Sequence, residues 1–392
     1  MKLFSILPCM FLEIEPKVAS FIISAIASNL GSSNLISTLS LSIFNLVVAL
    51  SAEMVSMSSA VLQVQDLDLK GNAALVKLNI YLPDNSPITS VDLSDFVNLE
   101  FIDFANFLEI NLSKNTKLKH IQTTKAPNLA AINVSNNGNL ETLYLFNNNE
   151  LSSLDVNDNL KLKDLRVRAP KLDYLNVRNN VNLETLLVSN AQLSAIDVSA
   201  NEKLEFLRLD SLKLTSLDVS NNLHLKQLYC YNNNINALDL SNNGELIYLN
   251  CNSNQLTNLN LSNNTKIEEV LCFNNQIEGE AMNELISSLP QTQGKLYVVY
   301  PEGEDGNDFT IHHYHYLKEN RWKSYYMTLV WFPYKGCYDF SGSEITDAFW
   351  PTDINSIEQN KQRCLIFDMS GRRMEQLTKG LHIINGKKAV IK

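Results

Sequence analysis

Apolar and polar residues alternate along most of the chain in an arrangement that repeats. A tetrapeptide of the form LDVS returns as VDLS, INLS, INVS, LDVN, LNVR, IDVS, LDVS, LDLS and LNLS. Its second residue falls at Asp92, Asn111, Asn133, Asp155, Asn176, Asp197, Asp218, Asp239 and Asn260. The successive gaps are 19, 22, 22 and then five of 21, with an imperfect copy around Asp68. A period of this length predicts a solenoid of stacked, similar coils.

A second motif, LxxLxLxxNxL, lies between these tetrapeptides and predicts one short strand per coil. Its clearest copy is Leu225, Leu228, Cys230, Asn233 and Ile235, and two further copies follow with the same period as the tetrapeptides. In earlier copies Leu212, Ala191 and Pro170 replace the asparagine. We therefore expect the regular part to run from Leu162 to Ile277, after looser coils that lack the turn asparagine.

The alternation also predicts which residues face the inside of a coil. Leu228 and Cys230 should point inward, whereas Gln227, Tyr229 and Tyr231 should point outward. An asparagine such as Asn233 suits the first bend because its side chain can bond nearby backbone groups. Asn243 should support the second bend, and the periodic Asp and Asn anchors should serve turns rather than acid–base chemistry.

These motifs resemble the leucine-rich-repeat family, in the short-coil form of Bacteroidetes surface proteins and, more distantly, of internalins. The resemblance covers about Asp66 to Glu278. It implies a parallel β-ladder, in coils of about 21 residues, whose strand face binds a ligand. Ten strands at about 4.8 Å each would form a gently curved array roughly 50 Å long, with no room for a long helix in each coil.

Three cysteines, Cys230, Cys251 and Cys272, occupy the same inward position in three successive copies of the motif. Thiols in a row could suggest a metal site, but no CxxC or Cys-His spacing accompanies them. Disulfides between neighbouring strands would need an uncommon torsion. We interpret these residues as small apolar side chains of the core.

The repeat also predicts the residues of the open strand face. Middle outward positions are Asn79, Asp103, Gln122, Tyr144, Arg166, Leu187, Arg208, Tyr229, Asn250 and Leu271. Neighbouring outward positions are Phe146, Arg168, Phe206, Tyr231, Tyr248 and Phe273. Aromatic residues and arginine often anchor interfaces, although outward aromatics can also simply stack along a ladder. The candidate ligand-binding residues, here called the aromatic stripe, are Tyr144, Phe146, Arg166, Phe206, Arg208, Tyr229, Tyr231, Tyr248 and Phe273.

After the repeats, GEAMNELISSLP predicts a short helix ended by Pro290, and KLYVVY predicts a strand from Lys295. The segment resembles the unit that caps such repeats in Bacteroidetes surface proteins, including Gly306-Asn307 and Arg321-Trp322. His312, His313 and His315 should lie on an amphipathic surface helix. No further ligand is placed to complete a metal site with these histidines, and residues 302–306 do not match calcium-loop spacing.

The two ends of the chain suggest export. Residues from Ser370-Gly371-Arg372-Arg373 through Lys379-Gly380 to Gly386-Lys387-Lys388 resemble the C-terminal sorting domain of type IX secretion, and they predict strands separated by turns. The stretch from Val18 to Ala52 has no charged residue, as in a signal peptide or a membrane anchor, although it is longer than a usual signal. A buried apolar segment is the alternative.

The net charge of the chain excludes one class of partner. The chain carries −10 at pH 7, with +6 on residues 361–392 and −16 on the rest, which argues against a nucleic-acid partner. No catalytic motif is present, so we expect neither an enzyme nor a cofactor.

The expected divisions of the chain are an apolar segment (1–60), the solenoid (61–280), the cap (281–340), a linker (341–360) and the tail (361–392). We expect a monomeric secreted or outer-surface protein that binds a protein or glycan. The alternative is a self-assembling surface-layer protein, and membrane contact would come only through the N-terminal segment or surface attachment.

Overall fold

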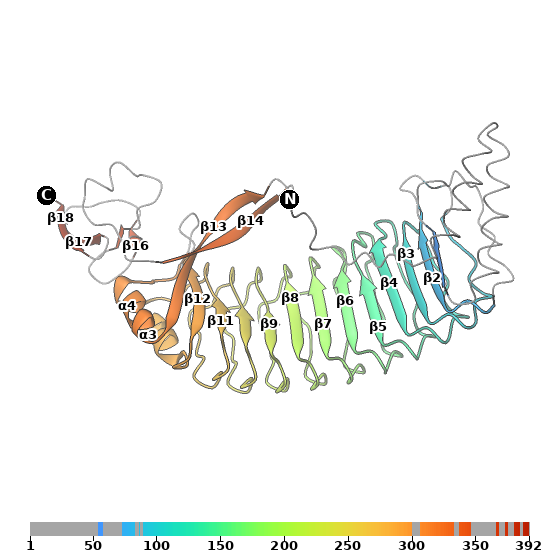
Figure 1. Cartoon of the computed structure of the whole chain (residues 1–392), viewed down its shortest axis with the longest axis horizontal. Helices are drawn as coiled ribbons and strands as arrows, with labels where there is room; N and C mark the ends of the chain where they lie inside the picture. Colours follow the sequence, from blue (N-terminus) through green and yellow to red (C-terminus); the bar gives the residue numbers. More distant parts are fainter. Residues whose placement is uncertain are drawn as a thin grey trace, which may run out of the picture.

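One long sheet forms the frame of the molecule (Figure 1). The computed structural model describes residues 54–57, 73–82, 86, 89–299, 306–332 and 337–345, and four short strands of the tail. The repeat strands are β1 (Met54–Met57), β2 (Lys77–Tyr81), β3 (Phe101–Ala105), β4 (His120–Lys125), β5 (Thr142–Leu145), β6 (Asp164–Arg168), β7 (Thr185–Ser189), β8 (Phe206–Asp210), β9 (Gln227–Tyr229), β10 (Tyr248–Asn250) and β11 (Glu269–Leu271). They pair in parallel and in chain order, so each coil stacks on the coil before it.

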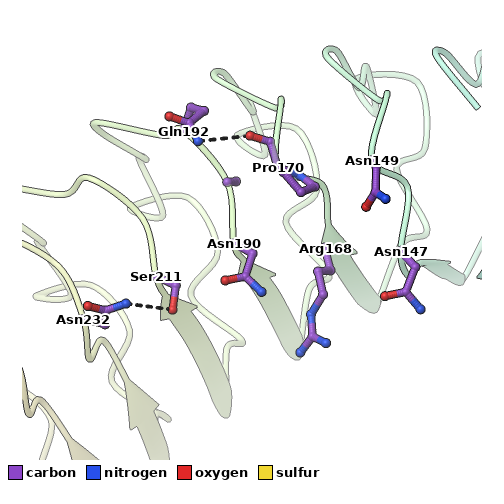
Figure 2. Close-up of a pocket in the computed structure, with 9 residues that line it drawn as sticks. Asn147, Asn149, Arg168, Pro170, Asn190, Gln192, Ser211 and Asn232 are labelled. Carbon is purple, nitrogen blue, oxygen red and sulfur yellow. Dashed lines mark hydrogen bonds between the residues drawn. The ribbon is translucent and has the colours of Figure 1, made fainter. Parts of the chain in front are cut away.

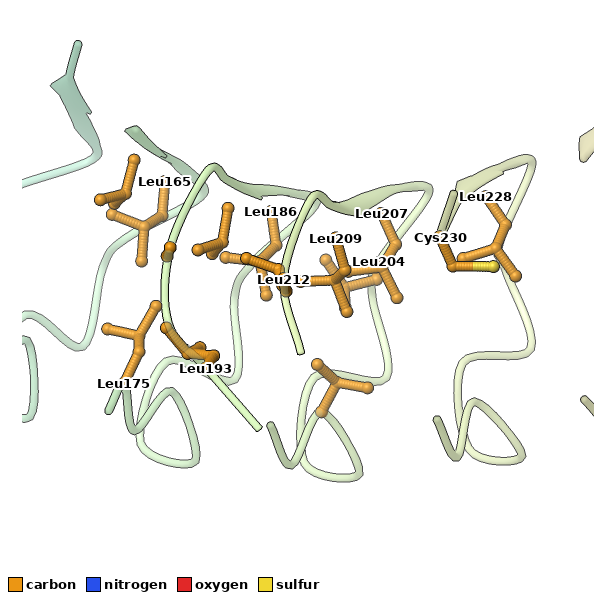
Figure 3. Packing of buried hydrophobic residues seen from close by; sticks show 14 of the residues in the cluster. Leu165, Leu175, Leu186, Leu193, Leu204, Leu207, Leu209, Leu212, Leu228 and Cys230 are labelled. Carbon is orange, nitrogen blue, oxygen red and sulfur yellow. The ribbon is translucent and has the colours of Figure 1, made fainter. Parts of the chain in front are cut away.

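Stacked leucines fill the inside of the solenoid. The inward residues Leu165, Leu186, Leu207 and Leu228 lie in register on neighbouring strands and are fully buried (Figure 3). A single coil could not shield these side chains from water, whereas each coil in the stack buries the apolar surface of its neighbours. The array curves gently, and its described coils contain no long helix (Figure 1). The predicted short-coil solenoid is therefore correct.

The periodic Asp and Asn anchors form turns, as predicted. Asp218 Oδ1 accepts a hydrogen bond from the backbone N–H of Ser220 at 2.9 Å. Asp197 does the same with Ser199, and its Oδ1 also accepts from the Ser199 hydroxyl at 2.6 Å. This bond to the residue two positions later recurs at all nine anchors from Asp92 to Asn260. The aspartate carboxylates of the anchors thus stabilise backbone turns.

A ladder of buried asparagines ties neighbouring coils together at the second bend. Its members are Asn115, Asn137, Asn159, Asn180, Asn201, Asn222, Asn243 and Asn264, which are all fully buried. Each donates two hydrogen bonds from Nδ2 to backbone carbonyls of the preceding coil, for example from Asn243 to Val219 and Asn222 at 3.0 Å. The predicted role of Asn243 is therefore correct and extends through eight coils. Within the described part of the chain, the Oδ1 atoms of this ladder accept no hydrogen bond.

The first bend uses a residue with left-handed backbone followed by a polar side chain. Asn232 has φ 54°, a region that asparagine tolerates better than most residues. Asn233 Nδ2 then donates to the carbonyls of Leu209 at 2.8 Å and Cys230 at 3.0 Å, as the turn role predicted. The expectation that coils before Leu162 lack this asparagine is wrong at one place. Asn148 occupies the same position, is buried, and donates from Nδ2 to Thr123 Oγ1 at 2.9 Å.

The three stacked cysteines lie in the core, as the repeat predicted. Cys230, Cys251 and Cys272 are in the reduced, thiol form and have no exposed surface. Burial raises the pKa of Cys230 to about 12, which keeps this thiol protonated and unreactive at neutral pH. These side chains therefore serve packing.

A small α/β unit covers the last coil. It contains α3 (Gly279–Ser288), β12 (Gly294–Val299), α4 (Ile311–Glu319), β13 (Trp322–Phe332) and β14 (Cys337–Glu344). β12 and β13 extend the parallel sheet, and β14 turns back antiparallel to β13 (Figure 1). The predicted helix and strand are present at the expected places. Trp322 is buried and donates from Nε1 to the Pro290 carbonyl at 2.8 Å, which fastens β13 to the end of α3.

The three histidines lie on α4, but they do not share one environment. His312 and His315 are exposed, whereas His313 is buried at the start of the helix. His313 Nδ1 accepts from the Thr310 backbone N–H at 3.0 Å, and Nε2 lies 2.9 Å from Asn283 Oδ1 on α3. Burial lowers the pKa of His313 to about 4, so the ring is neutral and joins the two helices. Across the described residues, no group of three or more His, Cys, Asp or Glu side chains is placed to hold a metal ion.

The tail forms a second, antiparallel sheet with the order β16-β15-β17-β18. Its strands are β15 (Ile366–Phe367), β16 (Arg373–Met374), β17 (Gly380–Ile384) and β18 (Lys387–Ile391). Strands separated by turns were expected there. The apolar N-terminal stretch, the copy around Asp68 and the acidic loop before Gly306 lie outside the described residues. Where the structure is described, no helix is long and apolar enough to span a membrane.

Candidate binding face

The parallel register aligns outward side chains into rows that run across the strands. The first row passes through Thr142, Asp164, Thr185, Phe206, Gln227 and Tyr248. The middle row passes through Tyr144, Arg166, Leu187, Arg208, Tyr229 and Asn250. A third row, at or just after the strand ends, includes Phe146, Arg168 and Tyr231. Because neighbouring strands lie about 4.8 Å apart, residues of one row can contact each other.

One group of stripe residues, the Tyr144 cluster, lies on β5 and β6. The rings of Tyr144 and Phe146 are tilted, with centroids 6.0 Å apart, and the Arg166 guanidinium lies 4.8 Å from the centre of the Tyr144 ring. Asp164 binds Arg166 through two hydrogen bonds of 2.9 and 2.8 Å and accepts from the Tyr144 hydroxyl at 2.6 Å. Partial burial and this carboxylate raise the pKa of Tyr144 to about 12. The cluster is thus an ordered surface on which the tyrosine stays uncharged.

A larger group, the Tyr229 cluster, lies on β8, β9 and β10. Tyr229 and Tyr248 are stacked with centroids 4.7 Å apart and planes inclined by 29°. Phe206 lies on the other side of Tyr229, with centroids 5.4 Å apart. All three rings are half-buried, so they contact neighbouring rings and still present apolar surface to solvent. Both interpretations of the outward aromatics, packing and exposure, therefore apply to the same rings.

Arg208 joins the polar side of the Tyr229 cluster. Its guanidinium lies 5.8 Å from the centre of the Tyr229 ring and 5.6 Å from that of Tyr231. Nη2 donates to the Tyr231 hydroxyl at 2.7 Å, and Nε donates to the buried carboxylate of Asp210 at 2.5 Å. Burial is the main cause that raises the pKa of Tyr231 to about 12. These contacts hold the arginine and two tyrosines in fixed positions, as expected of residues that anchor an interface.

Strand β7 separates the two clusters. The residues at its outward positions are Thr185, Leu187 and Ser189, of which none is aromatic or charged. Tyr144 and Arg208 are three strands apart in the middle row, which corresponds to about 14 Å. The structure therefore divides the predicted stripe into two clusters.

Phe273 was predicted to be part of the stripe, and this is wrong because the side chain is only 1% exposed. The coil after β11 is the cap rather than another repeat. β12 continues to Val299, past the last residue that pairs with β11, and Asn307 Nδ2 donates to the Cys272 carbonyl at 2.8 Å. The cap thus closes over the end of the last coil. Asp103 and Asn250, two predicted middle-row positions, are also buried.

Sequence reasoning missed some residues of the face. Tyr297 on β12 and Tyr325 on β13 are stacked with centroids 4.6 Å apart and continue the middle row beyond Leu271. Aligning KLYVVY with the strand motif could have found Tyr297, but the step from Leu271 to Tyr297 is longer than the period of the repeats. The carboxylates of Asp164 and Asp210, which hold the two cluster arginines, were also missed.

A polar hollow of about 610 Å³, here called the amide hollow, lies at the ends of strands β5 to β9 (Figure 2). Its polar lining consists of Asn147, Asn149, Arg168, Asn190, Gln192, Ser211 and Asn232, with Pro170 and Ala191 between them. Only Arg168 was among the predicted outward positions. The other polar residues belong to turns, where the repeat motif shows no outward position.

Asp103 provides a test of the electrostatics at the N-terminal part of this face. The carboxylate is buried and accepts from the Tyr81 hydroxyl at 2.7 Å; burial raises the pKa of Asp103 to about 6. Because the folded pKa exceeds the unfolded one, the protonated acid stabilises the fold at low pH, and this contribution is lost as pH rises to about 6. Asp103→Asn should therefore raise the free energy of unfolding at pH 7 by about 1 kcal/mol, allowing for solvent screening, and change it little at pH 4.

Urea unfolding at the two pH values measures this effect, with Asp173→Asn as the matched control. Asp173 is exposed, so its neutralisation should alter stability little at either pH. A gain that is equal at pH 4 and pH 7 would show that Asp103 does not titrate as described.

Solved structures share this fold. The functional domain of InlJ from Listeria monocytogenes, which includes a cysteine ladder, is 26% identical with a TM-score of 0.50, over 65% of this chain and 54% of that one. InlF, an internalin from Listeria monocytogenes strain 4b F2365, is 18% identical with a TM-score of 0.53, over 71% and 80% of the two chains. The chain thus spans about half of the InlJ domain. No family model matches the sequence. No curated protein matches it either. The parallel solenoid of short, regular coils is the leucine-rich-repeat fold of internalins.

Proposed function

We propose that this chain is a secreted or cell-surface binding protein that engages a protein or glycan ligand with the outward face of its strands. The observation that carries the proposal is the Tyr229 cluster. A stacked pair of tyrosine rings, a phenylalanine ring tilted against one of them, and an arginine held by Asp210 and Tyr231 lie together on the open side of β8, β9 and β10.

The side chains of the Tyr229 cluster are already ordered in the absence of a ligand. Aromatic and arginine side chains contribute much of the free energy of binding at interfaces, but immobilising them on binding costs about 0.5–1.5 kcal/mol for each side chain. In the Tyr229 cluster the rings and the guanidinium already support each other, so a ligand would meet a surface with little freedom left to lose. The Tyr144 cluster has the same construction, with Asp164 in the place of Asp210.

Export and the oligomeric state are further parts of the proposal. The uncharged stretch from Val18 to Ala52 supports a signal or an anchor, and the tail supports a type IX sorting domain, as in Bacteroidetes surface proteins. We propose that the protein is a monomer without catalytic activity or a cofactor. Its role would be adhesion or host interaction.

The resemblance to the InlJ domain supports one structural point. That domain includes a cysteine ladder, and Cys230, Cys251 and Cys272 are stacked here on three successive coils. We propose that the two sets play the same part, in which small side chains let neighbouring coils approach closely in the core.

The test of the proposed face is a comparison of tyrosine variants. Arrays of extracellular proteins and of glycans would first be screened with the full chain. The variant Tyr229→Ala with Tyr248→Ala should then bind the captured ligand at least tenfold more weakly, because two aromatic contacts worth about 1 kcal/mol or more would be lost. Binding is measured by surface plasmon resonance, and circular dichroism checks the fold.

Tyr174→Ala is the matched control, because Tyr174 is 68% exposed and lies outside the strand rows. Equal affinity of the double variant and the wild type would rule out the Tyr229 cluster as the site. If the screens capture nothing and light scattering shows growth of assemblies with concentration, the self-assembling surface-layer alternative is favoured instead.

A further inference from the structure

Arg168 differs from the other two arginines of the strand face. Arg166 is bound by Asp164, and Arg208 is bound by Asp210. No carboxylate of the described residues lies within ion-pair distance of Arg168, whose one hydrogen bond there runs from Nε to Ser189 Oγ at 3.3 Å. The two terminal nitrogens of this exposed guanidinium are therefore available to a ligand. An arginine of this kind binds a carboxylate well, because its planar fork can donate two parallel hydrogen bonds.

The surroundings of Arg168 are amides rather than apolar side chains. Arg168 extends from the end of β6 between Asn147 and Asn190, at the side of the amide hollow (Figure 2). The side-chain amides of Asn149 and Asn190 are exposed and form no hydrogen bond within the described part of the chain. Gln192 donates from Nε2 to the Pro170 carbonyl at 3.0 Å, which leaves its Oε1 as an acceptor. Each amide offers a donor and an acceptor side by side.

A local departure from the repeat shapes this hollow. At the first bend of neighbouring coils the left-handed residue is Asn147, Asn190, Ser211 or Asn232. The coil of β6 has Ala169 and Pro170 at the bend and no left-handed residue. The bend of this coil therefore carries no polar side chain of its own, and the amides of the neighbouring coils lie around it.

Charge around the hollow favours an anion. Lys171 pairs with Glu150 at 2.5 Å, and the carboxylate of Asp210 is held by Arg208, so these neighbouring acids are already paired. Among the described residues that line the hollow, Arg168 is the charged one, and no acidic side chain pairs with it. Against a net charge of −10 for the whole chain, this is a local positive site.

We propose that the amide hollow binds a carboxylated sugar, with Arg168 receiving the carboxylate and the amides of Asn149, Asn190 and Gln192 receiving ring hydroxyls. Paired hydroxyls of a pyranose match the paired donor and acceptor of an amide, and a shallow polar hollow offers no apolar socket for a peptide side chain. Uronic and sialic acids share this chemistry. The site lies beside the aromatic stripe and does not depend on it.

Binding of defined saccharides to the full chain tests the proposal. The probes are trigalacturonic acid with its methyl ester, and 3′-sialyllactose with lactose, titrated by calorimetry and saturation-transfer NMR up to about 10 mM, which detects even millimolar affinity. At least one acid should bind, and its neutral counterpart should bind at least tenfold more weakly. The two acids distinguish a uronic from a sialic source.

Two variants and two controls locate the site. Arg168→Gln should weaken binding of the acid at least tenfold, and Asn190→Ala should weaken it severalfold. Arg178→Gln is the matched control, because Arg178 is an exposed arginine of the next bend that pairs with Asp197 at 3.4 Å. It should leave binding unchanged, as should Tyr229→Ala with Tyr248→Ala, and circular dichroism checks that every variant folds.

Several results would overturn the proposal: no binding of either acid, equal binding of the neutral counterpart, or an unchanged affinity in Arg168→Gln. Loss of saccharide binding in the tyrosine variant would also overturn it, because the sugar would then lie on the stripe. Failure of the tyrosine cluster to bind the ligand from the array screen, in contrast, bears only on the proposed strand-face function.

Discussion

Replacing Asn222 by alanine should lower the free energy of unfolding by about 3 kcal/mol, because it removes both side-chain bonds at that step of the buried asparagine ladder. Asn222 Nδ2 donates to the carbonyls of Val198 at 3.1 Å and Asn201 at 2.9 Å. Each of these buried carbonyls keeps its backbone hydrogen bond, from the Asn201 N–H at 3.0 Å and from the Leu204 N–H at 3.1 Å, so the variant loses the second bond to each. A hydrogen bond contributes about 0.5–1.5 kcal/mol, and two bonds in a place that is closed to water should lie at the upper end of this range. Urea unfolding followed by circular dichroism measures the loss.

Asn221→Ala is the control for this experiment, since the two asparagines are adjacent. Asn221 is exposed and donates one hydrogen bond, to the Ser199 carbonyl at 3.1 Å. Water can replace this bond, so the variant should lose less than about 1 kcal/mol. Hydrogen exchange should show faster opening of the coils on both sides of Asn222, because stability in a solenoid depends on nearest neighbours. Equal losses in the two variants would mean that the ladder contributes no more than a surface amide.

Leu207→Ala should have an effect of the same size or larger, about 3–5 kcal/mol. Leu207 is fully buried between Leu186 and Leu228 on the neighbouring strands (Figure 3). The backbone of β8 is bonded to strands on both sides, so the coil cannot collapse into the space left by the missing side chain. The loss therefore includes a cavity contribution as well as the lost apolar burial. Thermal and urea unfolding both measure it.

The matched control is Leu223→Ala, which makes the same chemical change at a leucine that is 54% exposed. Its stability should change by no more than about 1 kcal/mol. A small loss for Leu207→Ala, comparable to the control, would show that neighbouring coils relax into the cavity and that the array is softer than its close packing implies.

The sequence predicted the regular coils well because each coil is the environment of the next. Once the period is known, the neighbours of Leu207 are known from sequence alone, and so are its burial and its register. The turn roles of Asp218, Asn233 and Asn243 followed for the same reason, since these bonds reach only to the same or the adjacent coil. Contacts between distant parts of the sequence need not be known where each coil makes the same contacts as the coil before it.

Prediction failed where that repetition stops. Phe273 follows a strand that pairs with the cap strand β12 rather than with a further repeat, and its side chain is buried. Tyr297 and Tyr325 were missed because the period lengthens before β12. Asn148 was missed although it occupies the motif position, because Glu150 stands where the motif has its last apolar residue, and Leu151 follows one position late.

The amide hollow was beyond sequence reasoning for a different reason. Arg166, Arg168 and Arg208 all occupy predicted outward positions, and what separates Arg168 from the other two is that no carboxylate on its strand reaches the guanidinium. That depends on side-chain geometry, which periodicity does not determine. The proposed divisions of the chain, its export and its sorting tail remain predictions.

The direction of the asparagine ladder has a consequence for how such a protein can change in length. Every member donates toward the coil before it, so one repeat segment both receives bonds at one side and gives the same bonds at the other. If recombination removed or duplicated one whole repeat segment, each ladder asparagine at the new junction would again meet the backbone carbonyls that it needs. Removal or duplication of part of a segment would not restore these bonds. The molecule can therefore be lengthened or shortened in steps of about 5 Å, and the distance between the two aromatic clusters can be inherited as a number of coils.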